Sequence, residues 1–271
     1  MRLAATAPFL CLCACTLTTA EPQIHVSPYL AVYRLRGDTS MQSQPTPSGP
    51  VQDNAPQTMR TFGQDHHRED VGVRVDIGDG FGGFRVDYYR LDMGTAETGV
   101  LTADWGALRA GDVVQMSAAM DEVRLGYLEP FVDVKSEYRD HPLRVRFAAG
   151  GVFAYRGLDL RARTEDGSRT QGVSIHGDVL YPALRAQVAY RDVSLDVEYA
   201  IAPDALVLGG DFDGVQQDFE ARIGYSLPMR DITFYGGYRY SEVPAEGTEG
   251  GLRYDADLVI DGFQFGVRVT F

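Results

Sequence analysis

Cysteine is nearly absent from this sequence, and its position limits the chemistry of the chain. The three cysteines are Cys11, Cys13 and Cys15. We interpret residues 1–20 as a secretory signal, because a basic start and an apolar run precede small residues and a cut near Ala20. After that cut no cysteine remains for a disulfide or a thiol nucleophile. An alternative, earlier cut would leave Cys15 as a lipidated residue, and we keep it open.

Long hydrophobic runs and excess positive charge are also lacking. A membrane helix needs about 20 consecutive apolar residues, and the run in the leader is shorter and interrupted. Lys and Arg number 25 against 38 Asp and Glu, a net charge of −13, which excludes a nucleic-acid partner that requires a basic stripe. A membrane β-barrel is still allowed, because half of its strand residues face a polar interior.

Alternation of apolar and polar residues is abundant, in a chain with 30 glycines, 15 tyrosines and 13 phenylalanines. A period of two is typical of β-strands. It recurs at 24–35, 71–78, 83–93, within 115–138, at 142–160, 173–190, 194–201, 217–227, 232–241 and 258–271. The pattern predicts an all-β chain with one domain over 21–271, an antiparallel up-and-down barrel of about ten strands. Eight or twelve strands stay open because 94–138 is ambiguous.

The connections between these segments alternate in length. Short ones are expected at 78–81, 139–142, 191–193 and 228–231, and long ones at 37–69, 94–114, 162–172, 202–215 and 242–257. Tight turns on one side and long polar loops on the other are typical of outer-membrane barrels. The first long loop is rich in Ser, Pro, Gln and Thr, so we expect 37–69 to be disordered. We also expect bulges at Pro130 and at Leu180–Pro182.

The polar residues between the apolar ones carry charges of both signs on neighbouring segments. In a narrow barrel they would pair across strands and fill the lumen, because a poorly solvated charge requires a partner. The predicted lumen network comprises Arg74, Asp76, Arg85, Asp87, Glu122, Arg124, Arg144, Arg146, Glu198, Glu220, Arg222, Arg239 and Arg268. A soluble barrel with its apolar face inward shows the same alternation, and this alternative stays open. No cofactor or metal is expected.

The last ten residues, "GFQFGVRVTF", place hydrophobic side chains at every second position up to the final residue. These are Phe263, Phe265, Val267, Val269 and Phe271. The stretch resembles the C-terminal assembly signal of small Gram-negative outer-membrane barrels, the group with OmpA-like, OmpW-like and OmpX-like proteins. That resemblance implies an outer-membrane location, insertion by the barrel-assembly machinery and contact with outer-membrane lipid and lipopolysaccharide. We expect this closing strand to pair with 24–35.

For function, the leading hypothesis is a non-enzymatic, porin-like envelope protein. It would be structural and engage ligands through acidic extracellular loops, or pass small solutes through a narrow channel. A second hypothesis is an outer-membrane hydrolase, a protease or a lipid A-modifying enzyme, with His66, His67 or His176 at the loop rim. We expect Ser174, His176 and Asp178 to face the lumen, which disfavours a catalytic set exposed to lipid. A third hypothesis is a soluble periplasmic barrel that binds an apolar ligand.

Overall fold

The computed structural model describes residues 22–43, 51–64, 66–94, 97–228 and 230–271. The predicted signal segment 1–20, with Cys15, lies outside the described residues. The only helices in the described part are the short 3-10 turns η2 (Met59–Phe62) and η3 (Asp204–Leu206). None of the described helices has the length and apolar content to cross a membrane.

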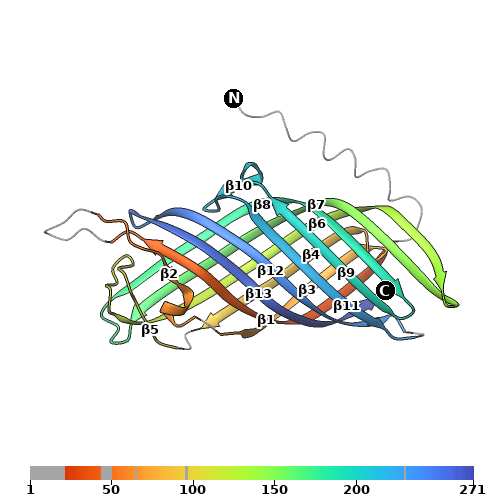
Figure 1. Ribbon diagram of the computed structural model, residues 1–271, viewed down its shortest axis with the longest axis horizontal. Coiled ribbons are helices and arrows are strands. Elements are labelled where there is room, and N and C mark those ends of the chain that lie inside the picture. Colours follow the sequence, from red (N-terminus) through yellow and green to blue (C-terminus); the bar gives the residue numbers. More distant parts are fainter. Residues whose placement is uncertain (1–21, 44–50, 65, 95–96, 229) are drawn as a thin grey trace, which may run out of the picture.

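Ten long strands of the described chain form a closed antiparallel ring, in which each strand pairs with the next one and the last pairs with the first (Figure 1). They are β1 (Gln23–Met41), β3 (Arg68–Gly78), β4 (Gly83–Gly94), β6 (Val113–Tyr138), β7 (His141–Thr164), β8 (Thr170–Tyr190), β9 (Val193–Ala202), β11 (Gln216–Ser226), β12 (Ile232–Glu249) and β13 (Leu252–Thr270). A ring leaves no free sheet edge along its shared length. The prediction of about ten strands in an antiparallel all-β fold is confirmed.

The ring closes where β13 meets β1. Their register runs from His25 opposite Thr270 to Met41 opposite Tyr254. Beyond it, the backbone N–H of Phe271 donates to the carbonyl of Ile24 at 2.9 Å. The expected pairing of the terminal strand with 24–35 is therefore confirmed, and it continues six residues further up β1.

We call the half of the barrel nearest the short turns the lower half, and the opposite half the upper half. In the lower half, apolar side chains point outward and polar ones inward. Leu184 on β8, for example, is exposed, while the next residue, Arg185, is buried. Exposed outward residues of this half form an apolar belt: Leu30, Val71, Val73, Val86, Leu125, Leu184, Ile223, Phe234, Phe263 and Phe265. Such a surface is favourable against lipid and unfavourable in water.

In the upper half the arrangement is reversed on the same strands. Ile175 on β8 is buried, whereas its neighbour His176 is exposed. The upper lumen is apolar and contains Leu91, Met93, Met116, Met120, Leu158, Leu160, Ile175, Leu258 and Ile260. The upper outer face is charged and carries Asp92, Asp121, Asp159, Arg161, Glu246, Asp255 and Asp257. Each strand therefore keeps its geometric alternation while the chemistry of its two faces is exchanged.

This exchange corrects the bulge predicted at Leu180–Pro182. The pairing of β8 with β7 runs without a register shift from Thr170 to Tyr190. The apolar residues change parity there because they face the lumen above that level and the outside below it. The bulge predicted at Pro130 is confirmed, since the β6–β7 register shifts between Pro130 and Val132.

The exchange of polar and apolar faces also explains why two segments that were predicted as long loops are mostly strand. β7 and β8 extend into 162–172 and leave only a five-residue turn between Thr164 and Thr170. β12 and β13 extend into 242–257 and are joined by Gly250 and Gly251, both with positive φ. Their polar residues are the water-facing side of strands, and the alternating partners are apolar because they face the upper lumen.

The region 37–69 needs a similar correction, apart from 44–50 and residue 65, which lie outside the described residues. It contains the end of β1, the short β2 (Gln57–Thr58) and η2. η2 places Phe62 inside the upper lumen, 5.2 Å from the ring of Trp105 in an edge-to-face contact. Trp105 lies in the segment 102–112, where its backbone exchanges hydrogen bonds with Leu108 in a reverse turn. These segments close the upper lumen as an apolar cap.

Short pieces of chain complete the upper wall, because β9 and β11 are shorter than their neighbours. β10 (Val207–Gly210) pairs with β8 in place of β9. Phe212 forms a bridge to Ala245 of β12, and the backbone N–H of Glu246 donates to the carbonyl of Asp211 at 2.9 Å. The segment 202–215, predicted as a loop, thus acts as part of the wall.

We predict that the apolar belt tolerates charge poorly. Phe265→Arg should lower the free energy of unfolding by about 2–4 kcal/mol in lipid, the cost of Arg near a bilayer midplane. Thr248→Arg, on the exposed face of the upper β12, is the matched control and should change it by less than about 0.5 kcal/mol. Urea titrations of protein refolded in lipid vesicles, followed by heat-modifiable gel migration, measure both. Equal effects at the two positions would contradict the assignment of the belt.

Candidate functional site

Buried charges fill the lower lumen in stacked tiers. In the upper tier, Glu122 on β6 accepts hydrogen bonds from Arg156 Nε and Arg239 Nη2, each at 2.5 Å. Asp218 on β11 accepts from Arg124 Nη1 at 3.0 Å, from Arg239 Nη2 at 3.1 Å and from Arg156 Nη2 at 3.2 Å. All five side chains are at most 5% exposed, so the pairing replaces the hydration that these charges lose.

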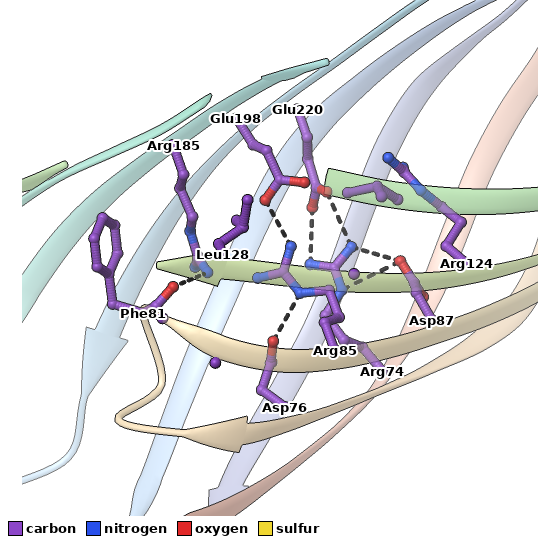
Figure 2. A pocket seen from close by; sticks show the side chains of 14 residues that line it. Arg74, Asp76, Phe81, Arg85, Asp87, Arg124, Leu128, Arg185, Glu198 and Glu220 are labelled. Atoms are coloured by element: carbon purple, nitrogen blue, oxygen red, sulfur yellow. Dashed lines mark hydrogen bonds and ion pairs between the residues drawn. The ribbon is translucent and has the colours of Figure 1, made fainter. Parts of the chain in front are cut away.

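A second tier lies directly below it. Arg74 on β3 pairs with Asp87 on β4 at 2.7 Å and with Glu220 on β11 at 2.9 Å, so it bridges opposite walls (Figure 2). The hydroxyl of Tyr29 donates to Asp87 at 2.9 Å, and the amide of Gln264 donates to Glu220. Four different strands besides β3 thus converge on one guanidinium and its partners.

Arg85 on β4 makes a parallel bridge beside Arg74. It pairs with Asp76 on β3 at 2.7 Å and with Glu198 on β9 at 2.6 Å. Figure 2 shows the two guanidinium groups side by side between the carboxylates of the two walls. Because both bridges cross the lumen, the network connects opposite walls of the barrel and does not merely cover their inner surface.

The turn between β3 and β4 closes the lower end. Phe81 folds into the lumen and is 1% exposed, with the guanidinium carbons of Arg146 and Arg185 at 4.4 and 5.1 Å from its ring centre. Arg185 Nη1 donates to the carbonyl of Phe81 at 2.8 Å, and Arg146 pairs with Asp79 of the same turn at 2.7 Å. Gly80, at φ +77°, allows the tight turn that was predicted at 78–81.

The space left between the tiers is very small. A cavity of about 20 Å³ is lined by Arg74, Asp76, Phe81, Gly82, Gly83, Arg85, Asp87, Arg124, Gly126, Leu128, Val152, Arg185, Glu198 and Glu220. A water molecule needs at least about 10–15 Å³ of such space. The cavity therefore fits about one water, and between the charged tiers and the apolar cap the described lumen is closed.

The predicted network residues are distributed as follows. Buried in the lumen are Arg74, Asp76, Asp87, Glu122, Arg124, Arg146, Glu198, Glu220, Arg222 and Arg239, with Arg85 only slightly more accessible. Arg268 is half-buried at the lower end of β13, and its Nε has no hydrogen-bond partner among the described residues. Arg144 needs a correction. It pairs with Asp133 at 2.6 Å, both more than one-third exposed, on a β6–β7 hairpin that continues below the ring.

The prediction missed Arg156, Arg185 and Asp218, which are central to the network. Each of these side chains occupies an inward-facing position in the alternation of its strand, so following the alternation along each strand would have identified them. Arg185 alternates with the apolar residues 184, 186, 188 and 190, so local alternation was sufficient to place it inward. Arg156 is harder to identify because it is surrounded by residues of the apolar upper lumen.

The upper outer face carries an acidic wall along β1, β12 and β13, formed by Asp38, Glu242, Glu246, Asp255 and Asp257. Asp38 and Asp257 lie directly opposite each other across the β1–β13 pair. Partial burial, together with the carboxylates of Asp257 and Asp255, raises the pKa of Asp38 above its usual range. Carboxylates that lie opposite each other on paired strands repel each other when both are ionised.

The candidate catalytic residues do not form a common centre. Ser174, His176 and Asp178 face outward on β8, which corrects the expectation that they face the lumen. His176 Nδ1 lies 3.3 Å from Asp211, whereas Ser174 Oγ donates to Asp159 at 2.6 Å. His66 and His67 lie just before β3. Among the residues that the structure describes, no group of His, Cys, Asp and Glu is arranged to hold a metal ion.

Comparison with known proteins identifies the fold. No family model matches the chain, and no curated protein matches it. Among solved structures, the outer membrane protease OmpT from Escherichia coli is similar over 94% of this chain and 99% of its own, with 12% identity and a TM-score of 0.52. The chain has the fold of an outer-membrane β-barrel.

More distant similarities include a Pseudomonas aeruginosa FadL homologue (9% identity, 93% and 90% coverage, TM-score 0.27). Another is the Pseudomonas putida toluene transporter TodX (9% identity, 93% and 91% coverage, TM-score 0.25). The finer resemblance to the OmpA-like, OmpW-like and OmpX-like group stays a prediction.

We predict that Glu122→Gln lowers the free energy of unfolding by about 3–5 kcal/mol, because it leaves buried arginines without their carboxylate. Asp133→Asn, which breaks an exposed pair, is the control and should cost about 1 kcal/mol or less. Equilibrium urea unfolding of both variants in the same lipid measures the difference. A cost for Glu122→Gln no larger than that of the control would show that the tiers do not brace the barrel.

Proposed function

We propose that the chain is a non-enzymatic outer-membrane protein of the Gram-negative envelope, with residues 1–20 removed. The lower half would span the bilayer, and the upper half would project outside as a closed, acidic barrel. Phe263, Phe265, Val267, Val269 and Phe271 would serve as the signal for the barrel-assembly machinery. Its role would be structural, with the acidic wall engaging cationic ligands.

The observation that carries this proposal is the exchange of polar and apolar faces along unbroken strands. Charged tiers occupy the lumen behind the apolar belt, while apolar packing fills the lumen behind the charged outer face. A barrel that is wholly in water has no reason to expose the belt. The projecting half has the inside-out polarity expected of a soluble barrel.

The closed lumen favours the structural role over the narrow channel. Three obstacles lie in series along the axis: the apolar cap with Phe62, the tiers around Glu122, and the Phe81 turn. The apolar upper lumen is filled by the chain's own side chains, so it also argues against the third hypothesis of a stored apolar ligand.

We predict that wild-type protein fractionates with the outer membrane, migrates differently on gels before and after heating, and shows no conductance in planar bilayers. A general porin inserted in the same bilayers is the positive control. Recovery of wild-type protein in the soluble periplasmic fraction would overturn the membrane proposal. Stable single-channel steps from pure protein would instead overturn the closed lumen.

A second candidate function is hydrolysis at the upper outer face. A hollow of about 260 Å³ there is lined by Ser174 together with Asp159, Arg161 and Glu249 among others. The His176–Asp211 pair lies on the same face, two residues along β8 from Ser174. The fold neighbour OmpT is a protease, which keeps this class in consideration.

The non-enzymatic proposal predicts, against this second candidate, that no hydrolysis of peptide or lipid ester substrates depends on this hollow. Ser174→Ala and His176→Ala should each leave any residual hydrolysis in a purified sample within about twofold of wild type. Asp121→Asn, on another strand of the outer face, controls for preparation differences. A loss of at least tenfold in both variants, with the control unchanged, would favour the enzyme.

A further inference from the structure

Two arginines lie on the outer face of β1 immediately above the apolar belt. Arg34 Nε and Arg36 Nε lie 3.0 and 2.7 Å from the same Oδ1 of Asp261 on β13. The hydroxyl of Tyr238 on β12 donates to the other oxygen of Asp261 at 3.0 Å. Asp261 is 5% exposed, while the arginine side chains are 33% and 41% exposed. One buried carboxylate therefore fixes two accessible guanidinium groups.

An apolar groove lies on the same outer surface, on β9, β11, β12 and β13 and nearer to the short turns than the cluster. It has a volume of about 580 Å³ and is lined by Val193, Ile223, Gly224, Tyr225, Phe234, Tyr235, Gly236, Phe265, Gly266 and Val267. Gly236 is opposite Phe265 in the β12–β13 pair, and a Cβ added at Gly236 would lie 3.3 Å from the ring of Phe265, so this ring packs directly over the glycine. Few water-exposed surfaces are this apolar.

The groove and the arginine cluster are joined by a continuous row of outer-face residues on β13. Phe265 lines the groove, Phe263 is next, and Asp261 follows. The ring of Phe263 contacts that of Tyr238 edge to face at 5.6 Å. Four residues of strand separate Phe265 from Asp261, about 13 Å at 3.3 Å per residue. Because transmembrane strands are tilted by about 45°, this length corresponds to about 9 Å of depth, which fits within one leaflet of the roughly 30 Å hydrocarbon core.

We propose that this surface binds a phosphate-bearing lipid of the outer leaflet, with its phosphate on Arg34 and Arg36 and an acyl chain in the groove beside Phe265. The inference rests on the proposed membrane placement. Guanidinium groups match phosphate oxygens with paired hydrogen bonds, and Asp261 holds both groups in one orientation before the lipid arrives.

The location favours an anionic lipid over a soluble anion. The wall above the cluster is acidic, with Asp38 and Asp257 opposite each other, so free anions approaching from solvent are repelled. A lipid arrives sideways within the leaflet and adds acyl contacts that a soluble phosphate lacks.

The test uses native mass spectrometry of the full mature protein in detergent, with dioleoyl phosphatidic acid as the probe. Wild type should retain this lipid, and Arg34→Gln/Arg36→Gln should weaken retention at least tenfold. Arg161→Gln/Arg163→Gln is the matched control, since these arginines are also two apart on an outer face, on β7 above the belt. It should stay within twofold of wild type. If the first double variant does not fold, Arg36→Gln alone replaces it, with a loss of at least threefold expected.

Two further probes separate the contribution of the phosphate from that of the acyl chains. Dioleoylglycerol, which lacks the phosphate, and glycerol phosphate, which lacks the chains, should each bind at least tenfold more weakly than phosphatidic acid. Gly236→Leu should weaken lipid retention, because the added side chain would displace the ring of Phe265 that lines the groove. Equal binding by the Arg34/Arg36 variant, or by either truncated probe, would overturn the site. Fractionation of the wild-type protein is evaluated separately. Wild-type protein that is found in the outer membrane but shows no lipid binding dependent on Arg34 and Arg36 rejects only the lipid site. Wild-type protein that is found in the soluble fraction rejects the proposed function.

Discussion

The pairing of buried arginines with carboxylates across the lower lumen is the interaction on which the rest of the structure depends. Arg74 and Arg85 each contact carboxylates of opposite walls, and Glu122 collects arginines from β7 and β12. These contacts require every strand to be in its correct register, because a slip of one residue would turn a charge toward the belt. The network therefore specifies the register of the strands in the ring in addition to stabilising the ring. As a consequence, it also closes the lumen.

The second organising feature is the level at which the two faces exchange their chemistry. Below it, the outer face is apolar and charges are enclosed; above it, the outer face is charged and Phe62 and Trp105 complete an apolar core. The same hydrogen-bonded strands serve both environments, since backbone pairing does not depend on which side is wet. The arginine cluster at Asp261 lies on the outer face at this level, where hydrocarbon would give way to headgroups.

Much of the ring could be predicted from alternation together with turn and proline signals, including the closing pair of strands, the turn at 78–81 and the bulge at Pro130. The upper half could not, because alternation reports that two faces differ and not which one is inside. The change of parity in β8 therefore suggested a bulge, and polar positions in 162–172 and 242–257 suggested loops. The outward positions of Ser174 and His176 follow only once β8 is known to be regular. Contacts such as Phe81 with Arg146 depend on how a turn folds back, which period-two patterns do not describe.

The charged outer face of the upper half also has a consequence for how such a barrel is made. If the lower half spans a bilayer, residues such as Asp159, Arg161 and Asp257 pass through hydrocarbon before they reach the far side. Each charged side chain at the bilayer centre costs about 2–4 kcal/mol, and a long hairpin such as β12–β13 carries several. Unassisted insertion would therefore face a kinetic barrier that barrels with strands ending at the membrane surface do not have. The length of the barrel beyond the bilayer is therefore limited by the route of insertion as well as by the stability of the folded protein.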